Sequence, residues 1–289
     1  MLGAATYDVL LRDTAVALTA AGIDNARFEA RLLLSHATGL TVERLIARGP
    51  DPVPADVTAR LRELTARRVR REPMAYILGE REFWGLRFMV SPAVLVPRPD
   101  SETVIETVLD LFPDRSRPLR TIDLGTGSGC LLLTLLREFS QAHGVAMDAS
   151  SAALEVARAN AEALGVASRT TFVAADWREP GWVRGLGGPF DLVVSNPPYI
   201  ESSAIDRLMP EVARHEPRLA LDGGPDGLEP YRLIASEAST LLVPGGWAVV
   251  EAGDRQASDI ADFFAAAGLN PLRPRKDLGG IDRVVASQH

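Results

Sequence analysis

The feature that most constrains the fold is a short apolar segment that leads into a glycine-rich loop and then into a helical stretch. Residues 119–124 form the apolar segment, and Gly125, Gly127 and Gly129 follow at alternate positions. Glycine tolerates positive φ and lets the backbone approach a ligand closely, while the N-terminus of the next helix favours an anionic group. The spacing differs from the dinucleotide fingerprint, whose last glycine would fall on Cys130. The loop predicts either a nucleoside-type ligand or only a tight turn from strand to helix.

The pattern around this loop predicts the fold class. From Ser101 onward, short apolar strands alternate with helical stretches, which is typical of a mainly parallel sheet with helices on both faces. The expected strands are 119–124, 142–147, 170–174, 190–195, 247–251 and 283–286. We therefore predict an α/β domain over residues 101–289.

The chain before Ser101 has a different character. Residues 7–21, 25–37 and 54–71 carry apolar positions at helical spacing, which predicts a small helical bundle over residues 1–72. Residues 73–100 contain two short β-type runs, and we interpret them as a β-hairpin linker that turns at Ser91-Pro92.

Acidic and aromatic residues stand where the second and third of these strands end. Asp148 could accept hydrogen bonds from both hydroxyls of a ribose, could cap the helix that begins near Ser150, or could do both. Asp176 could accept from an adenine amino group while Trp177 stacks on the ring, although a helix cap beside a packed aromatic explains the pair equally well. Together with the glycine loop, these strand ends predict a site for one adenosine-bearing cofactor.

The fourth strand ends in the tetrad Asn196-Pro197-Pro198-Tyr199. Two prolines stiffen the backbone, so that the Asn196 side-chain oxygen and the Pro197 carbonyl can both accept hydrogen bonds from one NH₂ group. Tyr199 can pack over a flat substrate. A plain proline turn is the alternative interpretation.

This tetrad resembles that of methyltransferases that act on exocyclic amino groups or side-chain amides, which include DNA adenine, rRNA guanine and protein glutamine methyltransferases. The resemblance implies S-adenosyl-L-methionine as methyl donor and S-adenosyl-L-homocysteine as product. It requires no metal, and a single cysteine with scattered histidines gives little support for one.

Further segments narrow the resemblance to the HemK/PrmC family of release factor glutamine methyltransferases. They are residues 73–79, 82–85, 94–102, 221–224 and 277–283. The resemblance implies a Rossmann-like class I S-adenosylmethionine-dependent methyltransferase domain behind a helical substrate-docking domain. It also implies methyl transfer to the side-chain amide nitrogen (N5) of the glutamine in the Gly-Gly-Gln motif of peptide chain release factors.

The family's functional residues carry over to matching positions of this chain. The cofactor positions are Asp123, Gly125, Thr126, Gly127, Ser128, Gly129, Asp148, Asp176, Trp177 and Asn196. The resemblance implies catalytic roles for Asn196, Pro197 and Tyr199, and contact of the glutamine with Asn196 to Tyr199. Phe83 or Trp84 is expected beside the substrate, unless both belong to the core of the hairpin.

Other classes of function remain as alternatives. A glutamine methyltransferase of a large-subunit ribosomal protein resembles the family in layout. A methyltransferase of DNA adenine or rRNA guanine would need a basic groove, which a net charge of −7 makes less expected. A cofactor-sensing or docking module without activity would need a damaged tetrad, and this one is intact.

The hydropathy of the chain and the charge at its start bear on its cellular location. No apolar run reaches the roughly 20 residues of a membrane helix, and the start of the chain lacks a positive n-region. We therefore expect a cytoplasmic protein that binds neither membrane nor nucleic acid, with its oligomeric state open and a monomer favoured.

The third expected helix is rich in arginine, with Arg60, Arg62, Arg67, Arg68, Arg70 and Arg71. A solvated helix face is one interpretation. The other is a docking surface for an acidic or RNA-associated partner.

Overall fold

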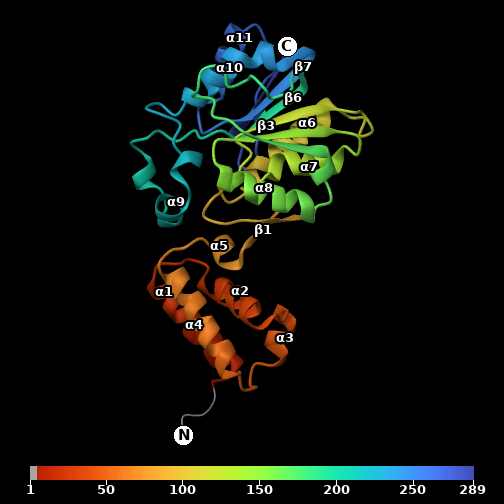
Figure 1. The fold of residues 1–289 in the computed structure, drawn as a ribbon. Coiled ribbons are helices and arrows are strands. Elements are labelled where there is room, and N and C mark those ends of the chain that lie inside the picture. Colours follow the sequence, from red (N-terminus) through yellow and green to blue (C-terminus); the bar gives the residue numbers. More distant parts are fainter. Residues whose placement is uncertain (1–4) are drawn as a thin grey trace. The chain divides into compact units, whose positions relative to one another are not determined.

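The computed structural model describes residues 5–289, which form two compact units. The first unit contains the chain up to Gly79 together with the separate segment Met209–His215, and the second contains Glu80–Leu208 and Glu216–His289 (Figure 1). The units therefore divide at Gly79, between the two boundaries expected from sequence, and the hairpin belongs to the second unit. No helix among residues 5–289 has the length and apolar composition of a membrane span.

The first unit is a bundle of helices, as the apolar spacing predicts. Its helices are α1 (Tyr7–Ala20), α2 (Ala26–Thr38), α3 (Val42–Ala47), α4 (Ala55–Val69), α5 (Met74–Leu78) and α9 (Pro210–His215). The Thr6 hydroxyl caps α1 by accepting from the amide of Val9, and Gly39 ends α2 in the left-handed conformation. The apolar faces of the long helices bury Leu18, Leu33 and Leu61. The short helices α3, α5 and α9 were not predicted, because one or two turns leave no clear period.

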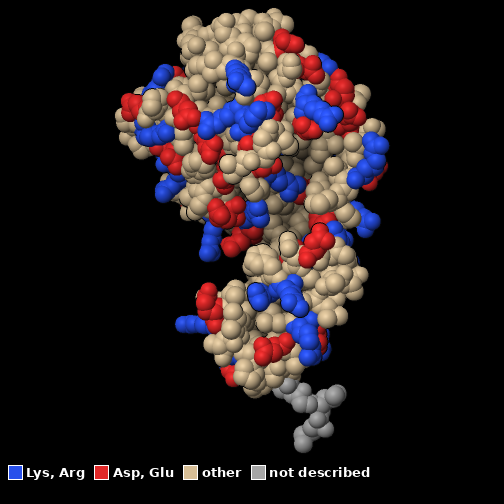
Figure 2. Space-filling view, turned by 180° about the vertical axis from the view of Figure 1, so that it is seen from behind, with Lys and Arg blue, Asp and Glu red and all other residues tan. Residues whose placement is uncertain are grey.

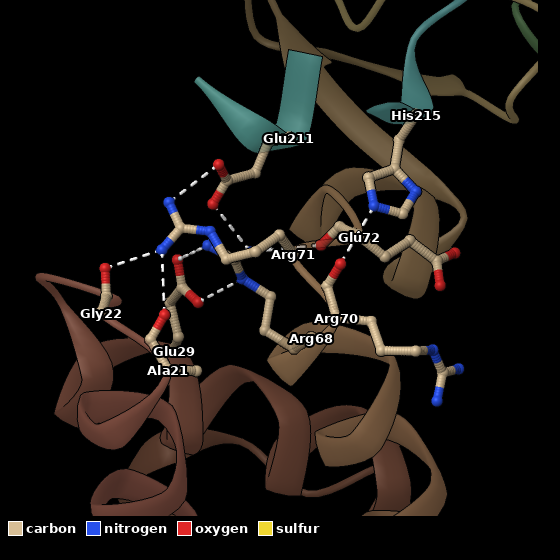
Figure 3. A network of polar contacts seen from close by, with 9 residues as sticks. All are labelled: Ala21, Gly22, Glu29, Arg68, Arg70, Arg71, Glu72, Glu211 and His215. Carbon is tan, nitrogen blue, oxygen red and sulfur yellow. Dashed lines mark hydrogen bonds and ion pairs between the residues drawn. The ribbon is translucent and has the colours of Figure 1, made fainter. Parts of the chain in front are cut away.

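The arginines of α4 take part in the internal structure of this unit. Arg68 is only 5% exposed, and its guanidinium donates to Glu29 at 2.6 Å and to Glu211 of α9 at 3.0 Å. Arg71 donates to the other oxygen of Glu211 at 2.9 Å and to the carbonyl of Gly22 at 2.7 Å (Figure 3). The solvated-face interpretation is therefore wrong for Arg68, and for both Arg68 and Arg71 these contacts favour an internal role over docking.

Of the other arginines of the cluster, one makes an ion pair within the unit and three are exposed. Arg67 is half-buried and donates to Glu72 at 2.9 Å, whereas Arg60, Arg62 and Arg70 are exposed. The Arg70 carbonyl also contacts the His215 ring at 3.1 Å (Figure 3). The sequence could not reveal this division, because the carboxylate of Glu211 lies far along the chain.

The second unit is built on one mixed sheet that contains the strands expected from sequence. Its path is β5 (Thr170–Ala174), β4 (His143–Asp148), β3 (Arg120–Leu124), β6 (Phe190–Ser195), β7 (Leu242–Glu251), β10 (Asp282–Gln288) and β8 (Asn270–Pro271), and β9 (Arg275–Lys276) also pairs with β10. The pairs from β5 to β7 are parallel, and β10 runs antiparallel to β7. The chain order reverses direction between β3 and β6, where Rossmann-like sheets bind their ligands. The α/β expectation is thereby confirmed.

Helices cover both faces of this sheet (Figure 1). The helices α6 (Glu102–Leu111) and α7 (Cys130–Glu138) pack into one apolar cluster with Leu192 and Val194. The helices α10 (Glu229–Leu241) and α11 (Ala257–Ala266) pack into the other with Ile122 and Val193. Neighbouring residues of one strand thus face opposite layers, as the period of two requires. The helix α8 (Ser151–Ala163) contacts α7, β4 and β5.

A two-stranded hairpin precedes this sheet, but it turns earlier than the sequence suggested. Strands β1 (Glu80–Phe83) and β2 (Leu86–Met89) pair antiparallel with Phe83 opposite Leu86. The connection is Trp84-Gly85, with φ of 53° and 68°. A two-residue turn with positive φ at both positions matches the twist of a hairpin, and the Glu102 carboxylate accepts from the Trp84 amide at 2.8 Å. The hairpin prediction is confirmed, whereas its turn at Ser91-Pro92 is wrong.

We predict that Arg68→Ala destabilises the first unit strongly. Removing one partner from a buried ion pair costs about 3–5 kcal/mol, and here it leaves Glu29 without its arginine while Glu211 retains only Arg71. Urea unfolding of the full chain should show an earlier first transition. Arg62→Ala, on the exposed face of the same helix, is the control and should change the free energy of unfolding by less than about 0.5 kcal/mol. Equal shifts in the two variants would show that the network contributes little.

Candidate functional site

A cavity of about 750 Å³ opens where the parallel strands of the second unit end. Its walls come from the glycine loop after β3, the ends of β4 and β5, the start of the tetrad after β6, and the segments around Arg98 and Asp222. Because the carboxyl ends of parallel strands meet at one edge, the structure brings together residues that lie far apart in sequence. Asp123, Gly125 to Ser128, Asp148, Asp176, Trp177, Asn196 and Pro198 all line the cavity.

The glycine loop forms the floor of this cavity through positive backbone angles. Gly125, Gly127 and Gly129 have φ of 75°, 55° and 81°, which side-chain-bearing residues rarely adopt. A Cβ added at Gly125 would lie 2.9 Å from the Trp177 ring, and one at Gly129 would lie 2.8 Å from Leu133. At Gly127 nothing lies within 4 Å. The first and third glycines therefore permit close packing inside the protein, and the second leaves room for a ligand.

Asp123 presents an unsatisfied acceptor at the head of the loop. It is 1% exposed, and one carboxylate oxygen accepts from the Thr126 hydroxyl at 2.7 Å. Its other oxygen, Oδ1, has no hydrogen-bond partner within the described structure. Burial, with a smaller contribution from Asp148, raises the pKa of Asp123 to about 7. A buried carboxyl with a vacant acceptor on a cavity wall is suited to a cationic ligand group.

The other two acids at strand ends, Asp148 and Asp176, differ in the contacts that their carboxylates already make. Asp148 accepts from the amides of Gly127 at 2.9 Å and Ser150 at 2.8 Å, and Ser150 itself caps α8. The alternative of Asp148 as the helix cap is therefore wrong. Asp176 is held by the Arg178 guanidinium at 2.6 Å, which lowers its pKa, so a ligand would share this carboxylate with Arg178.

Only Asn196 and Pro198 of the tetrad line the cavity. The amide nitrogen of Asn196 donates to the Ser101 hydroxyl at 3.1 Å, while its Oδ1 has no protein partner among residues 5–289. Pro198 lines the cavity, but Pro197 and Tyr199 do not. The Tyr199 hydroxyl donates to Glu251 at 3.4 Å, and its ring packs into the core beneath α10 and α11. This packing favours a supporting role for Tyr199, and its direct part in catalysis stays a prediction.

The two aromatics of the hairpin lie away from the cavity walls. Phe83 is buried against Phe88 in the core, with ring centroids 6.2 Å apart, and the Trp84 indole donates to Glu138 at 2.8 Å. Neither lines the cavity. This position favours the hairpin-core interpretation, and a contact of either ring with a substrate stays a prediction.

Sequence reasoning assigned no role to several residues of the site. Arg98 lines the cavity and donates to both oxygens of the buried Glu216 at 2.8 Å, and Ser101 holds Asn196. Glu251 lies at the end of β7 and has a raised pKa of about 7, mainly because it is buried. An apolar strand that ends in an acid, the signal that indicated Asp148, is also present at Glu251. Residues 5–289 contain no group of three or more His, Cys, Asp or Glu placed to hold a metal.

Comparisons with known proteins agree with this geometry. Residues 10–79 match the family model of the PrmC N-terminal domain, and residues 102–223 match that of the methyltransferase small domain. A release factor glutamine methyltransferase of Bradyrhizobium diazoefficiens is 46% identical over 280 residues, covering 96% of this chain and 93% of that protein. One of Caulobacter vibrioides is 45% identical, covering 92% and 90%. The chain belongs to the release factor glutamine methyltransferase family. The family resemblance drawn from the motifs is confirmed.

Solved structures support the fold of the second unit. A methyltransferase from Pyrococcus furiosus has a TM-score of 0.51 at 20% identity, covering 71% of this chain and 90% of that one. The catalytic domain of hMettl16, solved in complex with the MAT2A 3'UTR hairpin 6, has a TM-score of 0.57 at 19% identity and covers 78% of this chain and 81% of that one. At this identity the likeness concerns the fold alone, and it confirms the class I methyltransferase architecture of the family.

We predict that Gly125→Ala destabilises the apo protein more than Gly127→Ala. Both substitutions force a side chain to positive φ, which costs about 1–2 kcal/mol. Only the Cβ at position 125 also meets the Trp177 ring, and overpacking adds about 1–3 kcal/mol. Thermal unfolding of the two variants side by side measures the difference. Equal losses of stability would mean that the ring gives way without cost.

Proposed function

We propose that this protein transfers a methyl group from S-adenosyl-L-methionine to the side-chain amide nitrogen of the glutamine in the Gly-Gly-Gln motif of peptide chain release factors. The observation that carries the proposal is the orientation of Asn196 at the end of β6. Its Nδ2 is held by Ser101, and its acceptor oxygen remains for a ligand in the cavity. Family membership over nearly the whole chain supports the choice of substrate.

The residues of the cavity fit S-adenosyl-L-methionine. The vacant Oδ1 of Asp123 suits the ammonium group of the methionine part. Asp148 keeps lone pairs for ribose hydroxyls beside its two backbone donors, and Trp177 offers a ring face for adenine. The open space at Gly127 lets the ligand approach the backbone. When bound, the cofactor supplies a methyl group on a positively charged sulfur, which is already a strong methyl donor.

The protein must make the amide nitrogen of the substrate more nucleophilic. The lone pair of an amide is delocalised into its carbonyl, which makes the nitrogen a poor nucleophile. Asn196 Oδ1 and the Pro197 carbonyl would accept the two amide hydrogens and favour a pyramidal nitrogen with an exposed lone pair. Positioning and fixed dipoles then account for the catalysis. The released proton passes to solvent.

The alternative substrates have less support. On the face shown in Figure 2, acidic and basic side chains are interspersed, without the broad basic surface that nucleic-acid binding favours. The relatives are named for release factors rather than for a ribosomal protein. The first unit is the proposed docking domain, and its exposed arginines Arg60, Arg62 and Arg70 are the candidates that remain for contact with the factor.

Labelled methyl transfer from S-adenosyl-L-methionine to a purified release factor tests this proposal. We expect label on the wild-type factor and none on a factor whose Gly-Gly-Gln glutamine is changed to alanine. The enzyme variant Asn196→Ala should lower kcat at least about a hundredfold, which is the effect of removing one oriented hydrogen-bonding group from the active site of a hydrolase. Label on a large-subunit ribosomal protein or on nucleic acid alone would reject the substrate, and full kcat in Asn196→Ala would reject the site.

We predict that Asp123→Asn weakens cofactor binding by about 10–100-fold, because a charge-assisted hydrogen bond contributes about 1.5–3 kcal/mol. Isothermal titration with S-adenosyl-L-methionine measures the change. Since the pKa of Asp123 is raised to about 7, its charged form is lost as pH falls below that value. Wild-type affinity should therefore weaken below pH 7, while the affinity of the variant stays flat with pH. A parallel pH dependence in both proteins would assign the effect to another group.

A further inference from the structure

The proposed reaction needs the tetrad backbone in a fixed position, because one of its two acceptors is a backbone carbonyl. The carbonyl of Pro197 cannot turn independently of the chain, as a side chain could. Proline fixes φ near about −65°, so the pair Pro197-Pro198 behaves as a stiff piece of chain. Whatever holds the residues on either side of this pair therefore sets the direction of the carbonyl.

The chain enters the two prolines from a fixed point. Ser195 is buried and pairs with Leu124 in the parallel ladder between β3 and β6. Its hydroxyl donates to the Leu124 carbonyl at 2.6 Å. The side-chain amide of Asn196 is held in turn by the Ser101 hydroxyl at 3.1 Å. The position of the chain before the proline pair is therefore set by the sheet itself.

The exit from the two prolines is held by a glutamine from another part of the chain. Gln256 is half-buried and directly precedes α11. Its Nε2 donates to the carbonyl of Tyr199 at 3.0 Å and to that of Gly227 at 3.2 Å, and its Oε1 accepts from the amide of Gly253 at 3.0 Å. One side chain therefore ties the end of the tetrad to the turn after β7 and to residues 223–228, which precede α10.

Only a side-chain amide satisfies these three backbone groups together. They require two donors on one atom and an acceptor beside it, which is the set that glutamine offers. A glutamate of the same shape would place a carboxylate against two carbonyl oxygens. The reversed amide would likewise place its oxygen against the carbonyls of Tyr199 and Gly227. The chemistry of the contacts thus requires both the residue type and its orientation.

Two glycines bring residues 223–228 into direct backbone contact with the tetrad. A Cβ added at Gly223 would lie 2.8 Å from the Pro198 carbonyl oxygen, and one at Gly227 would lie 2.7 Å from Gln256 Nε2. The amide of Gly223 also donates to the carbonyl of Ile200, directly after the tetrad, at 2.8 Å. The segment that Gln256 ties to the tetrad therefore packs closely against it.

We infer that Gln256 is a positioning residue for methyl transfer, which directs the Pro197 carbonyl toward the substrate amide by holding the far end of the proline pair. The inference rests on the proposed function, which gives that carbonyl its role as an acceptor. Gln256 does not line the cavity, so it acts through the tetrad and not on the ligand. Loss of its donors would leave the entry at Ser195 intact and release the exit at Tyr199.

Steady-state kinetics of the full chain with a release factor test this inference through Gln256→Ala and Gln256→Glu. We expect Gln256→Ala to lower kcat at least about tenfold, since a misplacement of about 1 Å can cost about a hundredfold in rate. KM for the factor and the dissociation constant for S-adenosyl-L-methionine should stay within about threefold, because an interaction that acts only in the transition state changes kcat alone. Gln256→Glu keeps the shape without the donors and should lose at least as much kcat, whereas a space-filling role would tolerate it.

Gln288 offers a matched control in the same unit. It is also half-buried, and its side-chain nitrogen donates to the carbonyl of Gly245 at 3.3 Å. It pairs with Trp247, however, at the other end of the ladder from Glu251. Gln288→Ala should therefore keep kcat within about twofold of wild type. Equal losses of kcat in Gln256→Ala and Gln288→Ala would contradict the inference, and so would wild-type kcat in Gln256→Ala or Gln256→Glu.

Hydrogen exchange of the enzyme alone, followed by mass spectrometry, separates this inference from the proposed function. The amide of Ile200 donates to the Leu221 carbonyl at 3.0 Å, and that of Gly223 donates to Ile200. Both amides should exchange at least about tenfold faster in Gln256→Ala and keep wild-type rates in Gln288→Ala. A wild-type enzyme that labels no release factor would reject the proposed function, while this exchange still decides whether Gln256 holds the tetrad. Unchanged exchange at both amides would overturn the inference.

Discussion

Strand β3 pairs in parallel with β4 on one side and with β6 on the other, and the site depends on this double pairing. It aligns Leu124 with Met147 and with Ser195, so that three loops leave the sheet at one level. The Met147 carbonyl accepts from the amides of Gly125 and Thr126 at 2.9 Å, and the Ser195 hydroxyl donates to the Leu124 carbonyl at 2.6 Å. The glycine loop, Asp148 and the tetrad are therefore fixed by the same few contacts between neighbouring strands.

The polarity of the site is concentrated in carboxyls that water does not reach. Asp123 and Glu251 are each 1% exposed, and burial raises the pKa of each to about 7. Each also has one oxygen without a hydrogen-bond partner in the described structure, which costs free energy in the folded state. Proteins retain such groups mostly where function needs them. Asp123 lines the cavity, and Glu251 contacts the Tyr199 hydroxyl of the tetrad.

Local patterns in the sequence predicted what depends on local physics. Apolar runs of the right length indicated the strands of the parallel sheet. The glycines and acids at the ends of these strands indicated part of the cavity wall, because strand polarity brings those ends to one edge. The hairpin turn was misplaced because Trp84 adopts positive φ, which no propensity indicates. The burial of Arg68 by Glu211 and the contact of Asn196 with Ser101 join residues far apart in the chain. Such pairings become visible only once the fold has brought them together.

The helical unit is not a continuous stretch of sequence. It consists of the residues up to Gly79 and of the separate segment Met209–His215. The second segment provides Glu211, which pairs with both Arg68 and Arg71. Recombination at a single site therefore cannot transfer the whole unit from one gene to another. An exchange of the first 79 residues with a relative would replace the side chains at positions 68 and 71 while keeping Glu211. The two segments must therefore change together, which ties the evolution of the helical unit to a loop encoded within the catalytic one.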